Sequence, residues 1–224
     1  MSQSFIEEID ELIRARYSML YVVTWEEHRA RKLISHVAEK QHKPAYEWTI
    51  TNGLFLIDPV NKPVSVESNP RKPLEVLQNI LNSESEAIYI LHDFYHYWEE
   101  PEVARKLRDL SRVLKRTRKT IIILAPVLKL PDELEKSVTI VDLPLPDYED
   151  INKLLTNKII KTARNYRVEL SDDDKDKIIK AALGLTYDEA ENAYARAIVN
   201  DGVLCGKDIG IVLEEKVQII RKSG

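Results

Sequence analysis

The stretch TIIILA, Thr120–Ala125, decides the fold of this chain. It is continuously apolar after its first residue and is bounded by Lys119 and Pro126. A run of this kind is typical of a strand buried on both faces, because a half-exposed strand would alternate with polar residues. Outward along the chain, comparable runs occur at Met19–Val23, Ala87–Leu91 and Val138–Leu143.

Segments with apolar residues at helical spacing separate these runs. A fifth strand is predicted at Ala45–Thr51, and Asn52-Gly53 then indicates a tight turn into a small hairpin with Leu54–Ile57. Thr24 and Glu27 form a T-x-x-E pattern, which predicts a capping box at the start of the first crossover helix. Buried strands that alternate with helices predict a doubly wound α/β domain with a mostly parallel, five-stranded sheet.

After Pro146 the sequence predicts helices only. Asp147, Ser171 and Thr186 each precede an apolar pattern of helical period, as helix-capping residues do. Short helices cannot bury their apolar faces alone, so they should pack into a small bundle. We therefore predict two parts: an α/β core over residues 1–146 and a helical unit over residues 147–224.

Composition excludes several classes of protein. Hydrophobic residues make up 44% and charged residues 31% of the 224 residues, which is ordinary for a globular chain. The longest apolar stretch is far shorter than the roughly 18 residues of a membrane span, and the N-terminus does not resemble an export signal. With one cysteine and a net charge of −4, the sequence favours a reducing, cytoplasmic-type compartment and disfavours general binding of polyanions.

Several segments resemble an AAA+ ATPase module. Ile88–Asp93 looks like a Walker B strand, Leu143–Asp147 is similar to the boundary between the last strand and the lid, and Ala182–Ala197 looks like a pair of lid helices. More narrowly, LIRARYSMLYVVTWEE, PDELEKSVTIVDLPLP and AALGLTYDEAE resemble the N-terminal half of a tandem-AAA ATPase family from bacteria, cyanobacteria and algal plastid genomes.

The resemblance carries expectations for the whole protein. It implies a RecA/AAA-like sheet with a helical lid, no membrane, and a degenerate first module followed by a catalytic one beyond Gly224. ATP and magnesium would bind in that second module, and the parent would be a ring-forming, hexameric ATPase. Its location would be the cytoplasm, or the plastid stroma if a plastid genome encodes it.

The site of an active ATPase is missing from this chain. A phosphate cradle needs glycines and a lysine after the first strand, whereas Thr24, Trp25, Glu26 and Glu27 stand there. At the Walker B-like position Asp93 remains, but phenylalanine replaces the glutamate that follows it in active modules. The stretch of residues 127–138 also lacks an arginine that could act as a finger. We therefore predict no catalytic residue, metal or cofactor in this chain.

Two clusters beside Asp93 allow more than one interpretation. His92 and His96 have the spacing of metal ligands on one helix face, but a strand precedes them, so an ordinary strand end is favoured over a metal site. Asp93 would then hydrogen-bond to the neighbouring loop. Tyr95, Tyr97 and Trp98 are consistent with a partner-binding patch or with a loop packed against the lid.

A basic stretch covers residues 101–120, with eight basic and two acidic residues, or +6. Three uses are open: a solvated helix face, contact with an acidic neighbouring subunit, or binding of nucleic acid. Residues 169–189 carry −4, from seven acidic and three basic residues, which suits contact between like subunits. The residues predicted for subunit or partner contact are Arg105, Arg108, Arg112, Lys115 and Arg116.

Two classes of function follow. The first is a non-catalytic AAA+-like module that acts in assembly, regulation or partner binding for a downstream ATPase module. The second is a nucleic-acid-binding module that uses the basic helix of residues 101–120. Salt dependence separates the two, because contacts with several phosphates make binding fall steeply as salt rises.

Overall fold

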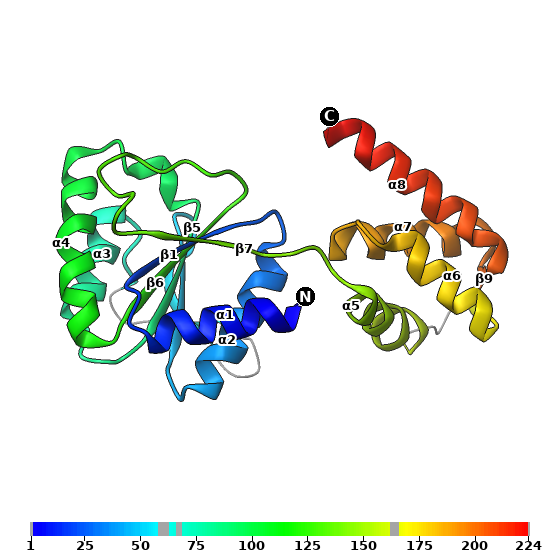
Figure 1. Ribbon diagram of the computed structural model, residues 1–224, viewed down its shortest axis with the longest axis horizontal. Coiled ribbons are helices and arrows are strands. Elements are labelled where there is room, and N and C mark those ends of the chain that lie inside the picture. The colour runs from blue at the N-terminus through cyan, green and yellow to red at the C-terminus, as the bar shows by residue number, and fades with distance from the viewer. Residues whose placement is uncertain (1, 58–62, 66–68, 162–165, 224) are drawn as a thin grey trace. The chain divides into compact units, whose positions relative to one another are not determined.

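A single sheet occupies the centre of residues 3–143 in the computed structural model, which describes residues 2–57, 63–65, 69–161 and 166–223 (Figure 1). Within these described residues the sheet has seven strands, in the order β4-β3-β2-β5-β6-β1-β7. The five parallel strands are β1 Met19–Val23, β2 Ala45–Thr49, β5 Ile88–His92, β6 Thr120–Ala125 and β7 Thr139–Asp142. The prediction of a mostly parallel α/β sheet is confirmed.

Two antiparallel strands extend the sheet beyond the predicted five. The hairpin at Asn52-Gly53 is confirmed: β3, Gly53–Ile57, pairs with β2, and Gly53 has the positive φ of +76° that such a turn requires. β4, Pro63–Ser65, then adds a further edge strand. Proline argues against a strand in the sequence because it has no amide hydrogen for the ladder, so this strand was not predicted. It is tolerated here because an edge strand needs no donor on its outer side.

Helices cover both faces of the sheet, and the alternation along β6 shows why. Ile121 and Ile123 pack in one core cluster with α3 Pro73–Asn82 and α4 Pro101–Thr117. Ile122 and Leu124 pack in the other cluster, with α1 Ser2–Arg14 and α2 Glu27–Lys40. Because successive side chains of a strand point to opposite faces, a continuous apolar run is what a sheet covered twice requires.

The second unit lies in residues 144–223, and it has a core of its own. Asp147, Ser171 and Thr186 cap α5, α6 and α7 as predicted, each accepting a hydrogen bond from the amide three residues on. The helical elements are α5 Tyr148–Lys153, the π-helical segment η2 Leu154–Ile160, α6 Asp172–Ala182, α7 Tyr187–Asp201, the short η3 Gly206–Asp208 and α8 Ile209–Ser223.

The expectation of helices only is wrong for this unit. β8, Arg167–Glu169, and β9, Val203–Cys205, form a small parallel sheet of two strands among the described residues. Each strand has three residues, too few for an alternating pattern to stand out in the sequence. No helix in the described part of the chain is long and apolar enough to cross a membrane.

Candidate functional site

The loop between β1 and α2 lies at the carboxyl end of an interior parallel strand, and doubly wound sheets bind their ligands at this end of their strands. Thr24 continues β1, since its amide donates to the carbonyl of Ala125 at 2.8 Å. Trp25 follows with 77% of its surface exposed, and Glu26, only 6% exposed, is the N-cap of α2. The loop thus places one large apolar side chain in solvent and one carboxylate inside the protein.

The predicted capping box of Thr24 and Glu27 does not form. The hydroxyl oxygen of Thr24 instead accepts a hydrogen bond from the amide of Glu26 at 2.9 Å, which makes a tight turn before the helix. α2 therefore begins at Glu27, two residues later than the pattern indicated. The carboxylate of Glu26 pairs with Arg29 one turn along the helix, at 2.5 Å.

A buried ionic cluster lies beside this loop and joins three elements. The imidazole Nε2 of His92, at the end of β5, is 2.6 Å from Oε1 of Glu47 on β2. The other carboxylate oxygen of Glu47 accepts from Arg31 of α2 at 3.1 Å. His92 Nδ1 lies 3.2 Å from Oε2 of Glu27, an ion-pair distance at which its N–H does not point along a regular hydrogen bond. We call these four residues the His92 cluster.

Charge within the His92 cluster holds the imidazole protonated at neutral pH. Burial by itself lowers the pKa of His92, but Glu27 and Glu47 outweigh it and raise the pKa from 6.5 to about 9. Burial raises the pKa of Glu47, yet its contacts with His92 and Arg31 lower it overall. Contact with His92 likewise lowers the pKa of Glu27, against the effect of burial. Two carboxylates and two cations therefore balance in the cluster, three of them largely buried and Glu27 half-exposed.

Sequence reasoning missed Glu47 and Arg31, and it weighed His92 only as a metal ligand or as part of an ordinary strand end. The available signal was Glu47, a charged residue in the strand Ala45–Thr49 between apolar neighbours. A charge in a buried strand is costly unless a partner neutralises it. The sequence does not name that partner, because Arg31 and His92 come from other elements and meet Glu47 only in the folded sheet.

The metal interpretation of His92 and His96 finds no support in the geometry. His92 is buried between carboxylates on opposite sides of its ring, whereas His96 is exposed and packs against the ring of Tyr95 at 4.1 Å. Within the described residues, no three histidine, cysteine or acidic side chains converge where a metal ion could bind.

Asp93 does not act as predicted. Its backbone adopts the left-handed conformation, with φ 51° and ψ 25°, and leads into the short helix η1, Phe94–Tyr97. The Asp93 amide donates to Leu124 O at 2.9 Å and its carbonyl accepts from His96 N at 3.2 Å, but the carboxylate makes no capping bond to the turn. Aspartate suits this position because it tolerates the left-handed region better than most residues.

The aromatic residues after β5 belong to the core of the α/β unit. Trp98 is 4% exposed and stacks on Tyr21, with ring centroids 5.6 Å apart. Tyr97 packs edge-on against Trp48 and Phe94 at 6.1 and 5.7 Å. The interpretation as a partner-binding patch is therefore wrong for the buried Trp98, and Tyr97 packs against the same core. Packing of this loop against the lid stays a prediction. Spacing could not reveal the contacts with Tyr21 and Trp48, because these partners come from β1 and β2.

The basic helix α4 is less uniform than its sequence indicates. Arg105 pairs with Asp109 and Arg108 lies 3.5 Å from Glu133. In the part of the chain that the structure describes, the exposed side chains of Arg112, Lys115 and Arg116 have no ion-pair partner. The structure thus divides the five predicted contact residues into two neutralised arginines and three free cations.

Lys119 does not belong to that basic face. Its side chain is buried, and Nζ donates to the carbonyls of Ile80 at 2.8 Å and Leu81 at 3.3 Å, and to that of Ser83. These carbonyls lie at the end of α3, where a helix leaves acceptors without internal partners. Lys119 therefore caps a helix, and burial lowers the pKa of its ammonium.

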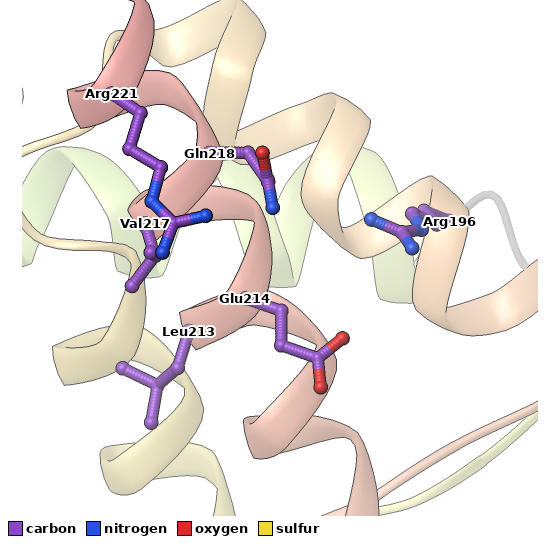
Figure 2. Close-up of a pocket in the computed structure, with 6 residues that line it drawn as sticks. All are labelled: Arg196, Leu213, Glu214, Val217, Gln218 and Arg221. Carbon is purple, nitrogen blue, oxygen red and sulfur yellow. The ribbon is translucent and has the colours of Figure 1, made fainter.

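On the helical unit, a shallow groove runs along α8 beside Arg196 of α7 (Figure 2). Leu213 and Val217 are exposed in it. The groove is lined by Arg196, Leu213, Glu214, Val217, Gln218 and Arg221. It is a surface feature of the helical unit, formed by other elements than those that carry the His92 cluster.

The residues at the carboxyl end of β1 do not suit binding of the phosphates of a nucleoside triphosphate. A phosphate at a helix N-terminus needs backbone amides brought close by glycine and a cation nearby. Here Glu26 and Glu27 start the helix, and both carboxylates are engaged with cations of the chain itself. A phosphate group would meet negative charge at this position and would have to break the pairs that neutralise it.

Comparison with known proteins identifies a family for both units. Residues 5–143 match the model described as the N-terminal domain of SpoVK-like AAA ATPases, and residues 149–223 match the second domain of the same group. Among curated relatives, the AAA domain-containing protein ycf46 of Pyropia yezoensis is 28% identical over 98% of this chain, and ycf46 of Guillardia theta is 28% identical over the same share. The chain spans 44% and 42% of the lengths of these two relatives.

Solved structures agree on the fold. PCH-2 of C. elegans superposes with a TM-score of 0.59 at 12% identity, covering 98% of this chain and 68% of that one. The AAA domain of FIGL-1, solved in complex with ADP, gives 0.58 at 10% identity, covering 89% and 71%. At such identities the likeness establishes the architecture only, which is that of an AAA domain. With both family models matching, this chain belongs to the SpoVK-like AAA ATPases and carries their N-terminal and second domains.

Proposed function

We propose that this chain is a non-catalytic AAA module that helps to assemble or regulate an ATPase module following it in the same protein. The observation that carries the proposal is the start of α2, where Glu26 and Glu27 replace the phosphate cradle and pair with cations of the chain. In this proposal the chain keeps the AAA fold but uses it for contact with other modules, since one fold can carry different functions.

The length of the relatives supports a partner module. The chain spans less than half of the curated ycf46 proteins, so those proteins have room for a further module of similar size. In this proposal ATP and magnesium bind in that second module, and the parent assembles into a ring in the cytoplasm or plastid stroma. The free cations Arg112, Lys115 and Arg116 of α4 then serve contact with an acidic surface of a neighbouring subunit.

Titration calorimetry of residues 1–224 with ATP and magnesium tests the absence of nucleotide binding. We expect no binding tighter than about 100 μM, which corresponds to roughly −5.5 kcal/mol. Asp93→Asn is the matched control, because it removes the carboxylate that a magnesium–nucleotide complex would use. Binding that is tighter than this limit in the native chain and lost in the control would overturn the proposal.

The same free cations favour one alternative function, which is nucleic-acid binding by α4. Phosphate contacts from Arg112, Lys115 and Arg116 would make affinity fall steeply between about 50 and 200 mM salt. Fluorescence anisotropy with labelled single- and double-stranded DNA and RNA measures this directly. A salt-sensitive affinity that Arg112→Glu abolishes would favour this alternative over subunit contact.

A further inference from the structure

The His92 cluster connects the first turn of α2 to the middle of β2 and to the carboxyl end of β5. Glu27 is the first residue of α2 and Arg31 lies one turn later on the same helix. Both reach the pair of Glu47 on β2 and His92 on β5. The helix start is therefore held through two ionic contacts that converge on neighbouring strands.

We propose that protonated His92, clamped between Glu27 and Glu47, is a proton-operated latch that fixes the first turn of α2 to β2 and β5. With the proton in place, two carboxylates face two cations, and both ring nitrogens carry a hydrogen. When the proton leaves, Arg31 alone faces two carboxylates, and one ring nitrogen can no longer act as a donor. The pair at Glu27 is the weaker of the two and breaks first, because its geometry is less regular and its side chain is 46% exposed.

The charged groups around the imidazole are those of the cluster itself. Glu27 acts on it from α2 and Glu47 from β2, while Arg31 acts through Glu47. β6, which pairs with β5 on its other side, is the run TIIILA and has no ionisable side chain. The pKa of about 9 follows from this surrounding and places the release of the latch on the alkaline side of neutrality.

Release affects only the start of α2. Ala30, Ile34 and Val37 of the same helix are buried in the core beneath the sheet and hold the remaining turns. The residue that loses its partner is Glu27, which directly follows the loop that carries the exposed Trp25. The latch thus controls the order of the segment that replaces the phosphate cradle.

Hydrogen exchange tests the latch, with protection factors corrected for the intrinsic effect of pH. The amide of Ala30, bonded to the carbonyl of Glu26 at 2.9 Å, reports the first turn. We expect its protection to fall about tenfold or more as pH rises through about 9, while amides in α4 keep theirs. In His92→Gln the protection should be low at every pH. His96→Gln is the matched control, since that exposed histidine lies outside the cluster, and it should behave as the native chain.

Glu27→Gln keeps the test decisive if His92→Gln does not fold, because Glu27 is half-exposed and its loss leaves the pair of Glu47 and His92 intact. This variant should lower the titration midpoint of His92, followed by the NMR signals of its ring, and should release the first turn at a lower pH. The latch is refuted if protection at Ala30 does not change across pH 9 in the native chain, or if His96→Gln alters it as much as His92→Gln does.

Discussion

Lys119→Met should destabilise the α/β unit although it removes one of eight basic residues from a stretch that reads as a solvated surface. The native ammonium is buried and donates to the carbonyls of Ile80, Leu81 and Ser83 at the end of α3. Methionine retains most of the apolar volume of the side chain but donates no hydrogen bond. The substitution therefore leaves these carbonyls without the donor that caps the helix.

The expected loss is about 2 kcal/mol of unfolding free energy. A hydrogen bond to a charged group contributes about 1.5 to 3 kcal/mol, and a buried acceptor left without a partner costs about 1 to 3 kcal/mol. The three bonds share one ammonium and do not add, and burial of the charge, which lowers the pKa of Lys119, offsets part of the gain. The net value thus corresponds to one good charged hydrogen bond.

Urea unfolding monitored by tryptophan fluorescence measures this loss in the α/β unit, which contains Lys119. The three tryptophans of the chain, Trp25, Trp48 and Trp98, all lie within residues 3–143, so the signal reports the α/β unit. At a slope of about 2 kcal/mol per molar urea, the midpoint should fall by about 1 M. Lys115→Met is the matched control, because that exposed lysine of α4 should change stability by less than about 0.5 kcal/mol.

Two outcomes would refute the reasoning. If Lys119→Met unfolds at the same urea concentration as Lys115→Met, then the carbonyls at the end of α3 do not depend on this ammonium. If the slope changes instead of the midpoint, the substitution has altered the unfolded or native ensemble and not the cap.

Three further results are expected. Asp93→Ala should lower the unfolding free energy by about 1 kcal/mol, whereas Asp93→Gly should retain most of the native value, because the left-handed backbone and not a carboxylate contact determines which residue is favoured there. Equal losses for the two variants in urea unfolding would contradict this. Arg112→Glu with Lys115→Glu should weaken self-association of a chain that includes the downstream module while leaving residues 1–224 folded, as sedimentation velocity and circular dichroism would show; unchanged assembly refutes the subunit contact. The stability that His92 contributes is full below pH 6.5 and is lost as pH rises through about 9, since its pKa is raised on folding. Over that range the native chain should lose on the order of 3 kcal/mol of unfolding free energy relative to His92→Gln, measured by urea titrations at successive pH values. A difference that stays constant with pH would be incompatible with this linkage.

The candidate site was predictable only in part, as Thr24, Glu26 and Glu27 illustrate. The absence of glycine and lysine after β1 is a fact of the sequence, and it was sufficient to predict that a phosphate cradle is missing. The capping box was wrong because two conformations compete for the hydroxyl of Thr24, and the tight turn onto the amide of Glu26 wins. The sequence shows which residues are present, but it does not show which of two nearby amide donors the hydroxyl of Thr24 accepts from.

The sequence by itself determined the layers of this protein. The run at Thr120–Ala125 and its counterparts are apolar on both faces, so a parallel sheet covered twice was the arrangement that buries them. Only the tertiary structure decided that Glu47 meets His92 and Arg31, that Lys119 leaves the basic face to cap α3, and that Trp98 stacks on Tyr21. Burial follows from composition along one segment, whereas each of these contacts joins residues from different strands and helices, and their distances are set only when the sheet has assembled.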